Sequence, residues 1–348
     1  MKIAVIGSGA IGGLVAGYLK HKGEDVLLVG RKDAVAAISA NGLHISGVRG
    51  NLKIKIDILP ALNKNVELVI LAVKTQDIEK AVKENLGFLN NATILTTQNG
   101  MQADKILARH IARTQIISSI VMFGATYLEP HKIVHNFEGK WILGRPFAEE
   151  SCPALPAGRQ AAGRDDKLRE VVSVLNKIFP TGISGDILGM KWLKMFLNAS
   201  NCLPAILGKS MQETFNSLEL CKLSMRLWQE GLDIINKSGI KLASLPDFPL
   251  ERLTKLSALP LEESARIFCG IMTNLSREPL YGSVLQSIKR NRPSEIDYIN
   301  GEFVALAGAK GFKSPLNERL VKLVRRVERS KRFLDLKELL EDTKEFLK

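Results

Sequence analysis

The sequence predicts an α/β domain with a mostly parallel sheet, followed by an all-α domain. Short apolar runs alternate with helical patterns over the first half of the chain, and helical periodicity prevails from Ile187 onward. A glycine-rich turn between the first apolar run and the first helical pattern supports the α/β assignment. These patterns divide the chain into two domains, residues 1–185 and residues 186–348.

The chain begins with a predicted strand over residues 1–6, a glycine turn, a helix over 10–20 and a second strand over 26–29. In this order, a G-x-G-x-x-G turn is typical of a Rossmann-type dinucleotide-binding domain. The first glycine allows the tight turn, the second lets the backbone approach a pyrophosphate, and the third lets the helix pack closely on the sheet. The residues predicted to form this site are Gly7, Ser8, Gly9, Ala10, Ile11 and Gly12.

The residue that follows the second strand indicates which dinucleotide is bound. An acidic residue there would bind the ribose 2′-hydroxyl of NAD, but this chain has Arg31 followed by Lys32. A guanidinium suits a 2′-phosphate, so the predicted cofactor is NADPH. The alternative is that Arg31 is a solvated surface charge.

The remaining elements of the first domain continue the alternation. Strands are predicted over residues 43–46, 52–56, 66–73, 92–97, 116–125, 132–136 and 140–143, the first two forming a hairpin. Helices are predicted over residues 34–40, from about 77 to 85, over 102–110 and over 168–178. Residues 145–167 are rich in Pro, Gly, Ala and Arg, and we interpret them as a mobile surface insertion.

Lys74 and Asn99 each stand just after a predicted strand. Because ligands of such sheets bind outside the carboxyl ends of the strands, both residues are expected beside the glycine turn. The alternatives are an exposed loop charge for Lys74 and a simple Asn-Gly turn for Asn99 and Gly100. The spacing alone leaves both interpretations open.

Helices are predicted in the second domain over residues 188–207, 211–236, 260–275, 284–289, 295–310 and, with interruptions, 315–347. Lys194 and Asn198 are four residues apart and share a helix face, which Cys202 continues. A lysine and an asparagine beside apolar surface need polar partners, and a substrate carbonyl and hydroxyl would supply them. The alternative is an exposed polar stripe.

Ser283 and Glu295 have structural explanations as well as functional ones. Ser283 with Gln286, and Ser294 with Asp297, have the spacing of helix capping boxes. Glu295 in a first helical turn would simply favour the helix dipole.

Composition narrows the classes of function. The net charge is +13, but the basic residues are spread along the chain and no nucleic-acid-binding module is evident. We therefore attribute the excess charge to an anionic cofactor and an anionic substrate. No apolar run suits a membrane span or a signal peptide, which predicts a cytoplasmic protein without a membrane partner. The four cysteines lack C-x-x-C spacing, which predicts reduced thiols and no metal site.

Together these motifs resemble the ketopantoate reductase (2-dehydropantoate 2-reductase) family. The resemblance spans nearly the whole chain, and its most specific piece is the segment from Glu295 to Gly301. It implies NADPH-dependent reduction of ketopantoate to pantoate, a step towards pantothenate and coenzyme A. The other motifs that carry it are the glycine turn with Arg31, Lys74, Asn99-Gly100-Met101, and Trp192-x-Lys194 with Asn198.

The resemblance also implies roles for single residues. Lys194 would protonate the carbonyl oxygen, and Glu295 would hold the substrate hydroxyl and orient Lys194. Asn99 and Asn198 would position nicotinamide, lysine and substrate, and Ser283 would bind the substrate carboxylate. The remaining implied contacts are those of Arg31 and Lys74 with the 2′-phosphate end of NADPH. The role of Lys194 suits this reaction. An ammonium beside the carbonyl stabilises the negative charge that develops on the oxygen when the carbon accepts hydride.

Three features depart from the family pattern, and one of them is the insertion over residues 145–167. Cys202 stands where the family often has a second asparagine, and Gln212 falls near another family asparagine. Cys202 is kept as a substrate-binding candidate, and Lys191 is a second candidate for the acid. The alternatives are a reductase of another 2-keto acid, an enzyme acting on a polyol phosphate, or an NADPH-binding sensor without turnover. A homodimer and closure of the domains on the substrate stay open.

Overall fold

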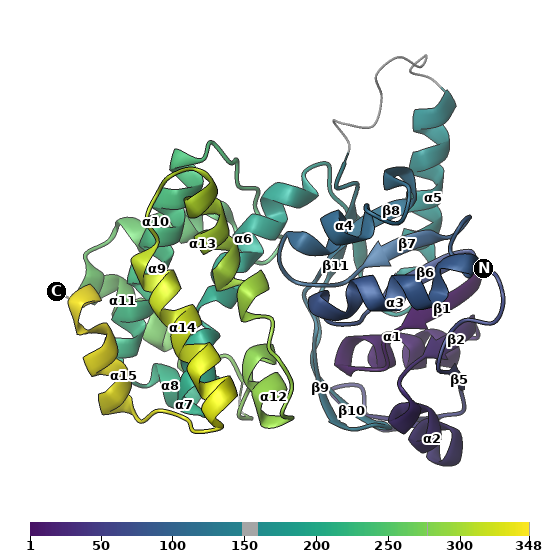
Figure 1. The fold of residues 1–348 in the computed structure, drawn as a ribbon, viewed down its shortest axis with the longest axis horizontal. Coiled ribbons are helices and arrows are strands. Elements are labelled where there is room, and N and C mark those ends of the chain that lie inside the picture. Colours follow the sequence, from purple (N-terminus) through teal and green to yellow (C-terminus); the bar gives the residue numbers. More distant parts are fainter. Residues whose placement is uncertain (148–158, 277, 348) are drawn as a thin grey trace. The chain divides into compact units, whose positions relative to one another are not determined.

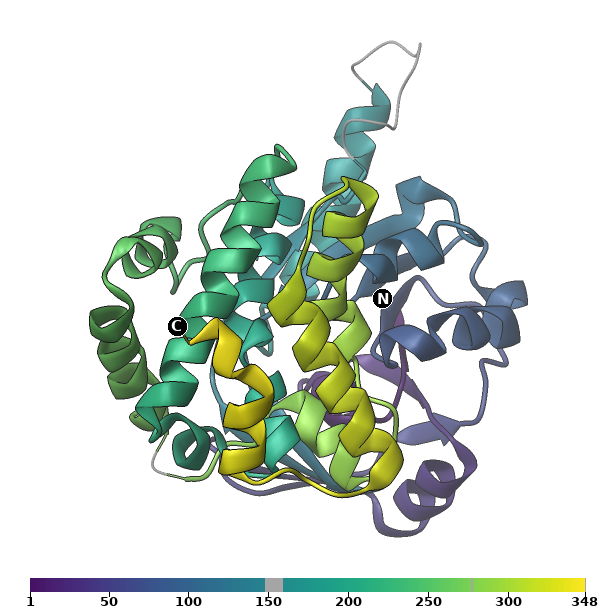
Figure 2. The ribbon, with the colours of Figure 1, turned by 60° about the vertical axis from the view of Figure 1, so that its left-hand side comes forward.

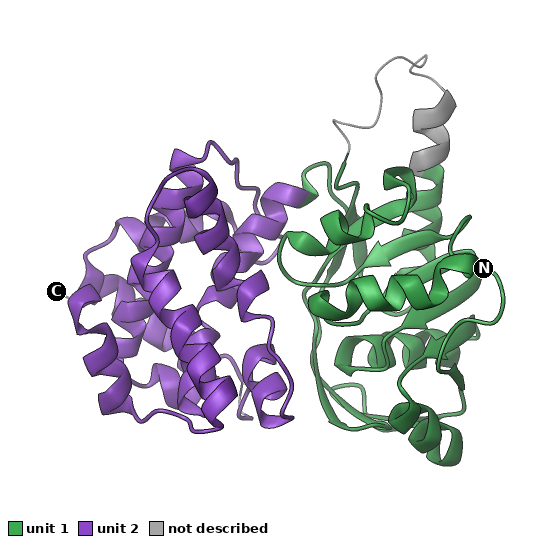
Figure 3. Ribbon diagram, in the orientation of Figure 1, with its two compact units in different colours: residues 1–187 green, residues 188–348 purple. Residues whose placement is uncertain are grey.

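The computed structural model describes residues 1–147, 159–276 and 278–347, with only the backbone for residues 159–165. The chain divides into two compact units, Met1–Ile187 and Leu188–Lys348 (Figure 3). The first is an α/β unit of the Rossmann type and the second is helical, as the sequence predicts. No helix in the described part of the chain is long and apolar enough to cross a membrane.

The first unit is built on a mostly parallel sheet (Figure 1). The strand order over the described residues is β12-β11-β8-β7-β6-β1-β2-β5, and β11 runs antiparallel to β8. The chain order reverses beside β1, which pairs with β2 on one side and β6 on the other, as in dinucleotide-binding sheets. The strands are β1 (Lys2–Ile6), β2 (Asp25–Val29), β5 (Asp57–Leu59), β6 (Leu68–Leu71), β7 (Thr93–Thr96), β8 (Ile116–Val121), β11 (Trp141–Gly144) and β12 (Thr181–Ile183).

Helices cover both faces of this sheet. Ile3 and Val5 of β1 belong to one apolar cluster, while Ala4 and Ile6 belong to a second cluster on the opposite face. The first cluster includes side chains of α1, α2 and α5, and the second includes those of α3 and α4. Burial on both faces explains why the strands are continuous apolar runs. The helices are α1 (Ala10–His21), α2 (Lys32–Asn41), α3 (Ile78–Asn85), α4 (Gln102–Leu107) and α5 (Arg159–Leu175).

A second, smaller sheet has the order β4-β3-β10-β9. The expected hairpin is confirmed, because β3 (Leu43–Gly47) pairs antiparallel with β4 (Leu52–Ile54). The single strand expected over residues 116–125 is wrong, since the chain leaves the first sheet after Val121 and enters the second as β9 (Gly124–Glu129). An unbroken apolar run does not reveal which of two sheets each part joins. Strand β10 (Lys132–Phe137) pairs with β3 and β9.

The insertion expected over residues 145–167 is wrong at its C-terminal end. Helix α5 already begins at Arg159, and residues 148–158 lie outside the described residues. The first turns of α5 contain Arg, Gln and Ala, which favour helix. They lack large apolar residues, so periodicity could not reveal the helix.

The second unit consists of helices, with α9 against α11 and α14 against α7 and α13 (Figures 1 and 2). Two helices that were expected to be continuous are interrupted, between Ala199 and Cys202 and between Phe215 and Leu218, and α10 was not expected. The helices are α6 (Ile187–Ala199), α7 (Cys202–Leu207), α8 (Met211–Phe215), α9 (Leu218–Lys237), α10 (Leu250–Ala258), α11 (Leu261–Thr273), α12 (Ser283–Lys289), α13 (Asn300–Ala309), α14 (Pro315–Ser330) and α15 (Leu336–Thr343).

A disulfide joins α9 to α11 through Cys221 and Cys269. The expectation of reduced thiols is therefore wrong for this pair. The two cysteines are 48 residues apart in the sequence, so only the packing of the helices brings them together. Cys202 is a buried free thiol, and Cys152 lies outside the described residues.

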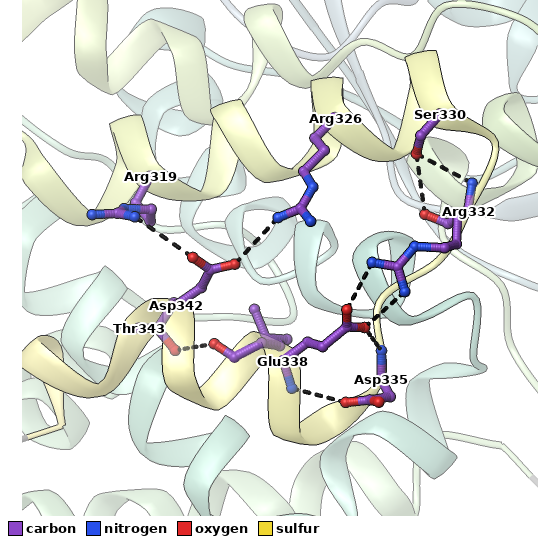
Figure 4. A network of polar contacts seen from close by, with 9 residues as sticks. Arg319, Arg326, Ser330, Arg332, Asp335, Glu338, Asp342 and Thr343 are labelled. Atoms are coloured by element: carbon purple, nitrogen blue, oxygen red, sulfur yellow. Dashed lines mark hydrogen bonds and ion pairs between the residues drawn. The ribbon is translucent and has the colours of Figure 1, made fainter.

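The last helix, α15, is held against α14 by ion pairs (Figure 4). The Asp342 carboxylate lies 3.7 Å from Arg319 and 3.5 Å from Arg326. Glu338 accepts two hydrogen bonds from the Arg332 guanidinium, which hold the pKa of its carboxyl at about 2. Arg319, Arg326 and Arg332, three basic residues near the end of the chain, thus serve as partners of acidic groups on α15.

Candidate active site

The glycine turn between β1 and α1 has no room for side chains at two of its three glycines. Gly7 has a φ of +116°, and a Cβ there would lie 2.6 Å from the carbonyl carbon of Ala72. A Cβ on Gly12 would lie 1.8 Å from the carbonyl oxygen of Gly7. The first and third glycines are therefore required by the turn and by the close packing of α1.

The middle glycine has a different environment. Gly9 is the N-cap of α1, and no atom lies within 4 Å of a Cβ placed on it. The N-terminus of α1 carries backbone N–H groups that have no partner within the helix, together with the positive end of the helix dipole. Open space at Gly9 beside such groups suits the close approach of a pyrophosphate.

The other residues predicted for the cofactor lie at the same edge of the sheet. Strands β2, β1, β6 and β7 are adjacent and parallel, and their last residues are in register, with Ile6 paired to Leu71 and Leu71 paired to Thr96. The chain continues from these ends into the turns that carry Arg31, Lys74 and Asn99.

Two of these side chains differ in exposure. The Arg31 side chain is 58% exposed, and its Nε lies 3.8 Å from the Asp33 carboxylate. Such a surface ion pair holds a side chain only weakly, so the guanidinium is available to a phosphate. Lys74 is half-buried at the N-terminus of a short 3₁₀ turn, Thr75–Asp77.

Gln98 is a positioning residue that sequence reasoning missed. Its Nε2 donates hydrogen bonds to the carbonyls of Leu71 and Val73, at 2.8 and 2.7 Å. These bonds fasten the turn after β7, which carries Asn99, to the turn after β6, which carries Lys74. The sequence shows Gln98 as part of a turn, and its acceptors are more than twenty residues away.

Helix α6 carries Lys194 and Asn198 one turn apart, and its other side is anchored in the core of the second unit. Phe196 packs edge-on against Phe303 of α13, and its carbonyl accepts a hydrogen bond from Trp228 Nε1 of α9. The two polar residues are half-buried.

Lys194 has an altered proton affinity. Burial, with a smaller contribution from the charge of Lys191, lowers its pKa from 10.5 to about 7. An amine with this pKa holds and releases a proton near neutral pH, which general acid catalysis requires. Lys191, the second candidate for the acid, is itself only 3% exposed.

Cys202 lies on a different helix from Lys194 and Asn198. The expected continuous helix is wrong, because α6 ends at Ala199 and Cys202 is the first residue of the next helix, α7. A proline two residues into α7 suits a new helix start, because its missing N–H would lack a helical acceptor there. The Cys202 side chain is fully buried, and burial raises the pKa of its thiol to about 12.

The segment from Glu295 to Gly301 meets the end of α6. Asn300 is fully buried, and its Nδ2 donates a hydrogen bond to the carbonyl of Ala199 at 3.1 Å. Glu295 is 4% exposed and lies just before the short 3₁₀ turn Ile296–Tyr298, not inside an α-helix. The expected place of Glu295 in a first helical turn is therefore wrong.

Ser283 is the first residue of α12 and not its cap. The N-cap is Gly282, and Gln286 donates instead to the carbonyl of Tyr281 at 2.8 Å, so the expected capping box is absent at this helix. A Cβ on Gly282 would lie 3.5 Å from Asn201 Cβ, which places the start of α12 beside the junction of α6 and α7. Apart from Cys202 on α7, the predicted catalytic and substrate-binding residues of the second unit thus lie on α6, at the start of α12 and in the Glu295 segment.

Two family models match the chain. The model described as ketopantoate reductase PanE/ApbA matches residues 3–146, and the model of the C-terminal part of the same family matches residues 186–328.

Curated relatives agree with these models. The 2-dehydropantoate 2-reductase of Pyrococcus horikoshii is 29% identical over 331 residues, which cover 94% of this chain and 98% of the relative. The 2-dehydropantoate 2-reductase of Aquifex aeolicus is 24% identical over 340 residues, covering 94% of this chain and 97% of the relative.

Solved structures share the fold. A D-mandelate dehydrogenase in a ternary structure with NADH and anilino(oxo)acetate has a TM-score of 0.78 at 23% identity, covering 95% of this chain and 99% of that one. A PanE/ApbA family ketopantoate reductase from Ralstonia eutropha has a TM-score of 0.74 at 23% identity, with the same coverage.

Proposed function

Because the chain belongs to the ketopantoate reductase family of oxidoreductases, we propose that it reduces 2-dehydropantoate (ketopantoate) to pantoate with NADPH. This reaction would supply pantothenate and coenzyme A biosynthesis. In this proposal the first unit binds the cofactor, and the second unit supplies the substrate-binding and catalytic side chains.

The observation that carries the proposal is the state of Lys194. Its pKa of about 7 and its half-buried place on an anchored helix suit an acid that protonates a carbonyl oxygen. Asn198 lies one turn away, and the buried Asn300 bond holds the end of the same helix.

The residues of the first unit fit a phosphorylated nicotinamide dinucleotide. The open space at Gly9 suits a pyrophosphate at the N-terminus of α1, and the exposed Arg31 guanidinium suits a 2′-phosphate. Lys74 and Asn99 would contribute from the neighbouring turns. When bound, this cofactor supplies the hydride.

The second unit would then handle the proton and the substrate. Lys194 holds a proton on Nζ and passes it to the carbonyl oxygen, where negative charge develops. Glu295 orients Lys194 and holds the substrate hydroxyl, and Asn198 holds the substrate in place. Ser283 donates a hydrogen bond to the substrate carboxylate.

A second candidate function is reduction of another branched 2-keto acid. It is favoured by Cys202 and Gln212, which depart from the family pattern. The Cys202 side chain is fully buried, and the Gln212 amide is bonded to backbone groups of the same unit. Fewer polar side chains would therefore surround the substrate than in a pocket with asparagines at both positions.

The test measures NADPH oxidation by the purified protein with ketopantoate, 2-ketoisovalerate, 2-ketoisocaproate and phenylglyoxylate. A kcat/KM for ketopantoate at least about tenfold above the others is expected, since matched polar contacts discriminate by such factors. A higher kcat/KM for another acid would favour the second candidate. Cofactor binding without turnover of any acid would contradict both and indicate a sensor.

The pH dependence of kcat/KM should report Lys194. The amine must be protonated to act as the acid, and its pKa is about 7, so kcat/KM is expected to fall as the pH rises above about 7. The Lys194→Arg variant keeps its charge throughout this range, so the residual activity should lose this fall. A parent profile that is flat from pH 6 to about pH 9 would contradict the assignment, because the acid would then not titrate in that range.

The Arg31→Ala variant tests the choice of dinucleotide. We expect the KM for NADPH to rise by about tenfold, because a charge-assisted contact to the 2′-phosphate is lost, while the KM for NADH stays unchanged. Lys32→Ala, one residue further along, is the matched control. Equal rises in the KM for NADPH and the KM for NADH would show that Arg31 does not contact the 2′-phosphate.

A further inference from the structure

Gln212 of α8 binds the loop that precedes α12, through backbone groups of Ser276, Glu278 and Leu280. Its Nε2 donates hydrogen bonds to the carbonyls of Ser276 and Glu278, at 3.0 and 2.9 Å, and its Oε1 accepts one from the Leu280 N–H at 3.0 Å. The neighbouring Met211 N–H donates to the Leu280 carbonyl at 2.8 Å. A primary amide has two N–H donors, and both are committed to this loop.

The loop leads directly to Ser283. Leu280, the last residue that Gln212 holds, is three positions before Ser283. Between them, a Cβ on Gly282 would lie 3.0 Å from the Met211 side chain, so the segment lies against α8. The backbone is thus fixed by α8 immediately before the hydroxyl that we assign to the substrate carboxylate.

We infer that Gln212 is a positioning residue that sets the place of the Ser283 hydroxyl for the carboxylate of the substrate. This inference rests on the proposed function. Loss of the amide would leave two carbonyls and one N–H without their partner, and the loop would sample other conformations. Carboxylate binding would weaken, whereas proton transfer from Lys194, on a different helix, would change less.

The departure at position 212 then has a structural meaning. Glutamine is longer than asparagine by one methylene group. Its amide bonds backbone groups of three alternate residues of the loop, Ser276, Glu278 and Leu280. It acts on the substrate through the loop and not by direct contact.

The experiment compares Gln212→Ala and Gln212→Glu with the control Gln229→Ala. Gln229 also bonds a backbone carbonyl of the second unit, that of Ser257 at 3.1 Å, but it belongs to α9 and does not hold this loop. Gln212→Glu keeps the acceptor for Leu280 and turns a carboxylate oxygen towards two carbonyls. We measure KM and kcat for ketopantoate and for its methyl ester, and hydrogen exchange of the amides of residues 280–283.

Both Gln212 variants are expected to raise the KM for ketopantoate about tenfold with kcat within about threefold, the scale of lost hydrogen bonds to a charged group. The KM for the ester, which lacks the carboxylate charge, should be unchanged, and exchange at Leu280 should accelerate in Gln212→Ala. A merely structural role would raise both KM values together and would overturn the inference. So would a KM for ketopantoate equal to that of Gln229→Ala.

The parent protein separates this failure from that of the proposed function. If the parent protein fails to oxidise NADPH with every 2-keto acid tested, the proposed function is overturned and, with it, the role of Gln212 in substrate binding. A parent that is active, with unaffected Gln212 variants, would overturn only the inference.

Discussion

Replacing Lys194 with Met is expected to lower kcat by about a thousandfold, since a positioned acid beside a developing oxyanion contributes at this scale. Methionine preserves the length and the apolar stem of the side chain, so α6 keeps its packing. Single-turnover oxidation of NADPH at saturating ketopantoate measures the effect on the chemical step. A variant that turns over like the parent would contradict the role of Lys194.

The same variant should be more stable than the parent at neutral pH. The pKa of Lys194 is about 7 in the folded protein, and we take the ordinary lysine value of 10.5 for the unfolded chain. At a pH between these two values, the unfolded chain binds a proton that the folded chain does not. Lys194 therefore costs stability at pH 7, and this cost disappears as the pH rises to 10.5. Thermal unfolding of both proteins across this range would show the advantage of Lys194→Met shrinking with pH.

Lys191→Met serves as the matched control. Lys191 is three residues earlier on the same helix, is buried, and lowers the pKa of Lys194 by its charge. Its removal should keep turnover and move the alkaline fall of kcat/KM to higher pH. If this variant lost turnover while Lys194→Met kept it, the role of the acid would pass to Lys191.

The first unit could be predicted from the sequence because its signals are local. A buried parallel strand is an apolar run, and each glycine of the turn has a fixed offset from the strand before it. The positions of Arg31, Lys74 and Asn99 follow from parallel pairing, since strands in register end at the same edge of the sheet. Periodicity did not reveal the second sheet or the start of α5, because an apolar run does not show which sheet its parts join and the first turns of α5 lack large apolar residues.

The second unit was predicted less well because its details depend on partners far along the chain. The break after Ala199 interrupts an apolar pattern that stays periodic across it, so Cys202 was expected on the same helix as Lys194 and Asn198. The Cys221–Cys269 disulfide, like the bonds of Gln212 to Ser276 and Glu278, joins residues that no local pattern relates. Such contacts are visible only once the helices are packed.

Replacing Gly12 with Ala is expected to destabilise the protein by about 3 kcal/mol, the upper range for an overpacked site. In an ordinary helix this change stabilises by about 1 kcal/mol, because glycine is a poor helix former. Here the new Cβ would lie 1.8 Å from the Gly7 carbonyl oxygen and 2.9 Å from Ala72 Cβ. Helix α1 would have to move away from the turn, and the midpoint of urea unfolding measures the cost.

Gly9→Ala separates the packing of this turn from its binding of the cofactor. No atom lies within 4 Å of a Cβ on Gly9, and its φ of −77° is allowed for any residue, so the expected loss of stability is that of alanine at an N-cap, about 1 kcal/mol. The new methyl group would occupy the space proposed for the pyrophosphate, so the Kd for NADPH should rise about tenfold or more. Fluorescence titration with NADPH measures this change. An unchanged Kd in a stable Gly9→Ala protein would contradict the proposed cofactor site, because the added methyl group would then lie where the pyrophosphate is proposed to bind without weakening its binding.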